Sequence, residues 1–174
     1  MIYDELMDQC GSILQLHIDE GDPSTFVVGR LLHATSDWLM LRLISTTGTW
    51  DGLGLFATSD IVSFEFDTKY IKKLVRLLEI RDAVEQPIID CEDDAFDTII
   101  DFARRNNRIL ALELEKSGQR DVIGYVYHYD DSLMISVVDE MGETDGLQYI
   151  EIDRITRVYC ADADLICLEL LFAK

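Results

Sequence analysis

Short stretches of alternating apolar and polar residues recur along the chain. Residues 12–19 alternate from Leu14 onward, and residues 109–115 repeat the alternation with three leucines. An alternation of period two puts every second side chain on one face of a β-strand. Both stretches therefore predict a first strand with one buried face.

A second pair of strands is predicted around two glycines. Residues 27–33 and 122–129 are rich in β-branched and aromatic residues, with Gly29 and Gly124 inside them. Such residues favour strands, and a glycine within a strand permits a bend or a close approach of another backbone. We therefore expect sharply curved second strands.

The remaining strands of each set are placed by turn signals. Residues 39–45 and 133–138 follow a polar turn and predict third strands. Asp51-Gly52 and Asp145-Gly146 then predict chain reversals, because glycine adopts the positive φ that such turns require. Short fourth and fifth strands complete each set.

Apolar residues at three- and four-residue spacing predict four helices. A short helix over residues 3–10 precedes the first set of strands, and a longer one that ends at Arg104 and Arg105 precedes the second. Residues 69–80 and residues 162–172 follow the two sets with the same spacing. Each set of strands is thus expected to lie between two helices.

The last predicted helix is more apolar than one buried face requires. Its large apolar side chains are Leu165, Ile166, Leu168, Leu170, Leu171 and Phe172. A helix that is apolar around more than one face is covered by more than one neighbour. We expect this segment to lie between the two sets of strands or in an oligomer contact, and a strand is the alternative structure for it.

The two sets align with each other along their length. Gly29 falls on Gly124 at an offset of 95 residues, and after a one-residue deletion Asp51-Gly52 falls on Asp145-Gly146. An ordered series of matching glycines, turns and apolar positions indicates an internal repeat. We interpret the chain as a tandem duplication.

This order of elements predicts an α+β fold that is mainly β. Five short strands with a glycine at a bend favour a small closed or partly open barrel, because closure removes exposed sheet edges. We expect two tandem five-stranded barrels, each with a preceding and a following helix. The first repeat spans residues 1–80, a linker that contains Pro87 spans 81–92, and the second repeat spans 93–174.

Charge narrows the choice of partner. The 174 residues include 34 Asp and Glu against 15 Lys and Arg, a net charge of −19. Nucleic-acid affinity depends on cations that displace counterions, so a nucleic-acid partner is not expected. The acidity favours solubility or, alternatively, forms a functional acidic surface. The basic residues either bind an acidic partner or pair with the chain's own acids. They concentrate at Lys72, Lys73, Arg76, Arg104 and Arg105.

Cellular location is predicted from the absence of export and membrane signals. No apolar run approaches the roughly 20 residues that cross a bilayer, and acids rather than a basic leader follow Met1. We expect a cytoplasmic protein with no membrane contact. Cys10, Cys91, Cys160 and Cys167 are accordingly expected to be reduced and mostly buried.

The sequence contains no recognisable catalytic constellation. His17, His33 and His128 lie in none of the spacings that zinc sites use, and no phosphate-binding loop or nucleophile motif occurs. His33 and His128 align between the repeats, and a shared metal site is the alternative to two ordinary strand-end side chains. We expect no enzyme, no cofactor and no metal.

Both repeats resemble the Sm-like family of small barrels, which shares its strand order with SH3-like barrels. The residues that carry the resemblance are Gly29 and Gly124 for the glycine of the first motif, Asp37 and Asp131 for the turn aspartate, and Met40 and Met134 for the apolar residue beside the RNA-reading asparagine. The resemblance implies a barrel in each repeat and assembly through strand edges.

Two departures from the Sm-like pattern concern RNA binding. Leu41 and Ile135 stand at the positions of the RNA-reading asparagine, and Ser59-Asp60 and Asp153-Arg154 replace the Arg-Gly pair before the last strand. An aliphatic side chain has no donor or acceptor to read a base edge. The divergent repeats are therefore expected to keep the barrel without the RNA signature.

Three functions follow from these observations. The favoured one is a noncatalytic binding or assembly module that self-associates or captures a protein partner through strand edges and the apolar C-terminal segment. The alternatives are an Sm-type RNA-binding protein and an acidic inhibitor or immunity-type protein that covers a basic site.

Overall fold

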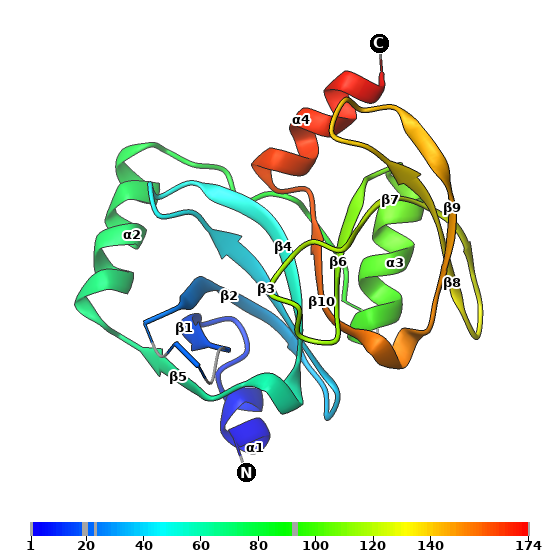
Figure 1. Ribbon diagram of the computed structural model, residues 1–174. Coiled ribbons are helices and arrows are strands. Elements are labelled where there is room, and N and C mark those ends of the chain that lie inside the picture. Colours follow the sequence, from blue (N-terminus) through cyan, green and yellow to red (C-terminus); the bar gives the residue numbers. More distant parts are fainter. Residues whose placement is uncertain (1, 19–20, 23, 92–93, 174) are drawn as a thin grey trace. The chain divides into compact units, whose positions relative to one another are not determined.

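The computed structural model describes residues 2–18, 21–22, 24–91 and 94–173. These residues form an α+β fold with ten antiparallel strands and four α-helices (Figure 1). The chain divides into two compact units, residues 1–95 and residues 96–174. The expected boundary between the linker and the second repeat, residues 92 and 93, lies outside the described residues.

The first unit is drawn from blue to green in Figure 1. Its elements are α1 (Ile2–Met7), β1 (Ile13–His17), β2 (Phe26–Ala34), β3 (Trp38–Ile44), β4 (Trp50–Ala57), the 3-10 helix η1 (Thr58–Asp60), β5 (Ser63–Phe66) and α2 (Lys69–Ile80). Its strands run in the order β5-β1-β2-β3-β4. The strand expected over residues 12–19 is observed as β1 and is shorter, Ile13–His17. Residue 19 lies outside the described residues.

The second unit repeats this arrangement. Its elements are α3 (Ala95–Arg105), β6 (Leu110–Leu114), β7 (Val122–Tyr129), β8 (Leu133–Val138), β9 (Thr144–Ile150), the 3-10 helix η2 (Ile152–Arg154), β10 (Ile155–Cys160) and α4 (Ala163–Phe172). Its strands run in the order β10-β6-β7-β8-β9. Each strand of the second unit therefore holds the position of the strand five places earlier in the first.

The two Asp-Gly pairs do not form the chain reversals that the sequence predicted. Asp51-Gly52 lies inside β4 and Asp145-Gly146 inside β9, each at a shift in the register with the preceding strand. The φ angles are +75° at Gly52 and +83° at Gly146. The chain reverses earlier, over residues 45–49 and 139–143. A β-bulge uses the same positive φ as a tight turn, so the dipeptide alone does not distinguish them.

Helices α2 and α4 are anchored alike. The Thr68 side chain accepts a hydrogen bond from the backbone N–H of Ile71, and the Asp162 side chain accepts one from that of Leu165. Such caps satisfy backbone donors at a helix start. Each helix then packs on its own sheet. The core under α2 contains Val28, Ile44, Ile71, Leu74 and Leu78, and the core under α4 contains Ile109, Ala111, Val138 and Leu165.

Gly29 and Gly124 lie where another backbone passes close by. A Cβ atom on Gly29 would lie 2.5 Å from the carbonyl oxygen of Arg42, and one on Gly124 would lie 2.1 Å from that of Ser136. Both distances are far inside van der Waals contact. A side chain at either position would therefore push the second and third strands of its unit apart.

The cysteines are less buried than expected. Cys160 is buried, and burial raises the pKa of its thiol to about 12. Cys10, Cys91 and Cys167 are exposed, and all four are free thiols. The expectation of mostly buried thiols is therefore wrong. Among the described helices, none combines the length and the apolar composition needed to span a membrane.

Candidate protein-binding surface

The terminal strand of the second unit, β9, is exposed along almost its whole length. Within the described strands it pairs with β8 and has no second neighbour. Every residue from Thr144 to Tyr149 is exposed, and Ile150 is buried. A strand that covers a core normally buries every second side chain. β9 instead presents a free edge and exposed side chains to solvent.

Apolar side chains gather on the face of this sheet that carries α4. The register places Tyr125, Ser136 and Leu147 in one row across β7, β8 and β9. Tyr149 lies two residues beyond Leu147 and therefore on the same face. At the other end of the row, the rings of Tyr125 and Phe172 lie 4.8 Å apart between centroids. These five residues are termed the outer β9 surface.

The equivalent positions in the first unit are covered. Leu53 and Leu55 of β4 hold the places of Leu147 and Tyr149 in the register. Leu53 and Leu55 are 0% exposed, whereas Leu147 is 55% and Tyr149 is 72% exposed. Both units thus carry large apolar side chains at the same two positions, but those of the second unit face solvent.

In the first unit, a segment that follows α2 crosses the row equivalent to Tyr125, Ser136 and Leu147. That row consists of Arg30, Arg42 and Leu53. The Glu85 carboxylate accepts hydrogen bonds from Arg30 Nε at 2.6 Å and from Arg42 Nη1 at 2.5 Å. Arg42 Nε also donates to the carbonyl oxygen of Pro87 at 3.1 Å. Through Glu85 and Pro87, residues 83–88 are therefore hydrogen-bonded to this face, and we term these residues the strap.

The two arginines also determine the titration of Glu85. Burial raises the pKa of its carboxyl group, but the hydrogen bonds and charges of Arg30 and Arg42 outweigh burial, and the pKa lies below its ordinary value. Arg42 is itself buried. The ionised strap glutamate thus neutralises a buried cation.

Acidic residues occur in the hairpin before β9, within β9 and directly after it. The stretch from residue 139 to residue 153 contains no lysine or arginine. Its acids are Asp139, Glu140, Glu143, Asp145, Glu151 and Asp153, and all but Asp139 are exposed. The equivalent stretch of the first unit, residues 45–59, contains Asp51 as its single acid. The apolar surface of the second unit therefore has an acidic rim that the first unit lacks.

Four of the five basic residues singled out in the sequence are engaged locally, and the fifth, Arg76, lines a groove beside α2. Lys72 pairs with Asp67 at 3.0 Å, and Lys73 lies 5.8 Å from the centre of the Tyr70 ring. Arg104 and Arg105 lie 3.9 and 4.0 Å from Asp101. The lysines belong to α2 and the arginines to α3, in different units.

The predicted apolar residues of the C-terminal helix divide between core and surface. Leu168 packs against the core under α4, whereas Leu171 and Phe172 are exposed. Phe172 joins the outer β9 surface through Tyr125. The sequence already showed that α4 is unusually apolar. It did not single out Leu147 and Tyr149, because an alternating strand pattern predicts that the apolar face is buried and cannot reveal that the face stays exposed.

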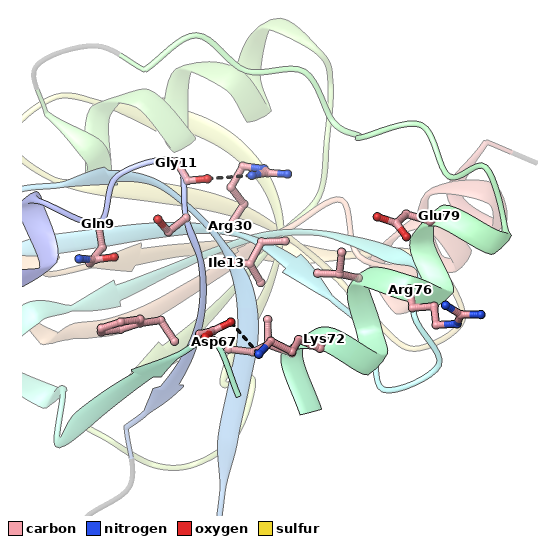
Figure 2. Close-up of a pocket in the computed structure, with 12 residues that line it drawn as sticks. Gln9, Gly11, Ile13, Arg30, Asp67, Lys72, Arg76 and Glu79 are labelled. Carbon is pink, nitrogen blue, oxygen red and sulfur yellow. Dashed lines mark hydrogen bonds and ion pairs between the residues drawn. The ribbon is translucent and has the colours of Figure 1, made fainter. Parts of the chain in front are cut away.

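A groove in the first unit is a weaker candidate site. It holds about 700 Å³ between the start of β1 and the helix α2 (Figure 2). Three of its charged groups are already engaged: Arg30 Nη1 donates to the carbonyl oxygen of Gly11 at 2.7 Å, and Lys72 pairs with Asp67. Charges that are satisfied in this way offer little to a ligand. Among the described residues, no three His, Cys, Asp or Glu side chains form a group suited to a metal ion.

No family model, no curated protein and no solved structure matches this chain. The outer β9 surface is therefore assigned from the geometry of the chain's own residues.

Proposed function

We propose that this chain is a noncatalytic protein-binding module made of two Sm-like barrels, and that β9 is its principal contact. The observation that carries the proposal is the exposure of Leu147 and Tyr149 at positions where the first unit has buried leucines. An exposed strand edge beside exposed large apolar side chains is a typical protein contact. β5 and β9 each have one neighbouring strand among the described strands, as the terminal strands of a partly open barrel do.

Two observations weigh against RNA as the partner. Leu41 and Ile135, at the positions of the family's RNA-reading asparagine, are fully buried. The net charge of −19 opposes a phosphate backbone. An acidic inhibitor of a basic protein is a second candidate, because exposed acids lie in β9 and directly before and after it.

The test compares wild-type protein with a variant that carries Leu147→Ser and Tyr149→Ser, both purified from native cells. Size-exclusion chromatography with light scattering, absorbance at 260 and 280 nm and mass spectrometry identify mass and companions. We expect a protein companion or a defined homo-oligomer that the double variant loses. A wild-type monomer without a companion would contradict the proposal, and RNA that dissociates as salt rises would favour the Sm-type alternative.

A further inference from the structure

Charge distinguishes between two occupants of β9, a second copy of the chain and a basic partner. A twofold contact between two β9 strands would oppose the same acidic rim on both copies. The other terminal strand, β5, contains Glu65 and is followed directly by Asp67. Like charges across a contact cost free energy, whereas a cationic segment gains from the same rim. The acids around β9 therefore favour a basic partner over self-pairing.

The first unit shows what kind of segment covers this face. Its strap is a segment outside the helices and strands, and its carboxylate Glu85 pairs with Arg30 and Arg42 of the sheet. At the equivalent places the second unit has Tyr125 and Ser136, with the acidic rim alongside. The two cations on this face of the first unit thus have no equivalent in the second unit, where the nearby charges in and beside β9 are acidic. An extended segment that matches the second unit would accordingly carry cations.

We propose that the free edge and outer surface of β9 bind an extended lysine- or arginine-rich segment of another protein. The segment pairs with the β9 backbone, its apolar side chains lie beside Leu147 and Tyr149, and its cations meet Asp145, at the bulge of β9, and Glu151, directly after the last residue of the strand. Cross-strand neighbours of this kind set both affinity and register. This inference rests on the proposed protein-binding function and names its partner class.

The probe is a fluorescein-labelled heptapeptide, Lys-Thr-Leu-Thr-Leu-Thr-Lys, whose lysines and leucines share one face when it is extended. Fluorescence anisotropy measures its binding to the full chain. We expect saturable binding that weakens at least about tenfold between about 50 mM and about 500 mM salt. Amide chemical-shift changes should centre on residues 144–150 and their partners in β8.

Two matched peptides and two matched variants test the assignment. Replacing both lysines of the peptide by glutamate, or both leucines by serine, should abolish binding. In the protein, Leu147→Ser with Tyr149→Ser should weaken binding by at least about tenfold. Val84→Ser with Ile88→Ser, which changes two exposed apolar residues of the strap, should leave it unchanged. Asp145→Asn with Glu151→Gln should weaken it about fivefold and flatten the salt dependence, without altering the apolar contact.

Several outcomes would overturn the inference. If the glutamate peptide bound as tightly as the lysine peptide, the acids of the rim would play no part in binding. If the Leu147→Ser, Tyr149→Ser variant bound the lysine peptide as tightly as the wild-type protein does, the site would lie elsewhere. If the lysine peptide fails while cells yield a companion that needs Leu147 and Tyr149, the cationic partner is wrong and the protein-binding function stands. If neither a peptide nor a companion binds, both proposals fail. A β9-dependent homo-oligomer that the peptide does not displace would replace the basic partner by a second copy.

Discussion

Strands β4 and β9 hold the same position in the two units and differ in what surrounds them. Both follow a hairpin, both contain a bulge with Gly at positive φ, and both place large apolar side chains two residues apart on one face. In β4 those side chains are fully buried, whereas in β9 they are among the most exposed apolar groups of the chain. The local pattern of apolar and polar residues thus determines where the strand forms and which side chains share a face. It does not determine whether another segment covers that face.

The second difference between the units is electrostatic. The first unit has Arg30 and Arg42 on this face and binds its own acidic strap. The second unit has neither arginine, and acids follow one another along the hairpin and β9. The arginines on this face of the first unit are therefore paired within the chain, whereas Leu147 and Tyr149 on the equivalent face of the second unit are exposed. Four changes test this comparison.

The largest effect is expected from truncating the covered leucine. Leu53→Ala should lower the free energy of unfolding by about 3–4 kcal/mol, because it removes a fully buried side chain and leaves a cavity. Leu147→Ala, the same change at the exposed equivalent, should cost less than about 0.5 kcal/mol. Chemical denaturation followed by circular dichroism measures both. Equal losses would mean that β9 is covered in solution.

A side chain at the glycine of the second strand should cost nearly as much. Gly124→Val should destabilise the protein by about 3 kcal/mol, because its Cβ would meet the Ser136 carbonyl oxygen at 2.1 Å. Gly29→Val should cost somewhat less, since the corresponding distance is 2.5 Å. Thermal unfolding by calorimetry reports each loss. An unchanged melting curve for Gly124→Val would contradict the close approach of the two strands.

Removing the strap's charge tests whether the first unit covers its own face. Glu85→Gln should lower the free energy of unfolding by about 1–2 kcal/mol at neutral pH. The loss is modest because Glu85 is partly exposed and solvent weakens its ion pairs. The folded-state pKa of Glu85 is lowered, so its contribution is complete above the unfolded pKa of about 4.3 and is lost as pH falls through the folded value. The difference in stability between wild type and variant should therefore shrink below about pH 4. A difference that grows in acid would contradict this sign.

The smallest effect is expected at the cap of α2. Thr68→Ala should lower stability by about 1 kcal/mol, because the backbone N–H of Ile71 loses its acceptor. Asp162→Ala at the equivalent cap of α4 should cost more, since Asp162 is buried and also pairs with Arg120. Denaturant midpoints of both variants measure the contrast. A larger loss for Thr68→Ala would show that the two caps are not comparable.

Much of the secondary structure was predictable because its signals are local. The helix expected over residues 69–80 is observed with those bounds, and a helix rather than a strand forms at residues 163–172. Helical spacing and β alternation act over a few residues and are legible in one sequence. The Asp-Gly pairs were misplaced for a related reason, since turn and bulge share a backbone conformation.

The contacts that distinguish the two units join residues far apart in the sequence. Glu85 reaches Arg30 across 55 positions and Arg42 across 43. A Cβ atom on Gly48 would lie 2.3 Å from Leu77 Cβ, and one on Gly142 would lie 2.6 Å from Leu171 Cβ, so each hairpin glycine also makes room for a helix. The sequence by itself determined the strands, the helices and the repeated order of apolar positions. Tertiary structure alone decided which apolar face the chain covers, because burial depends on segments that meet only after folding.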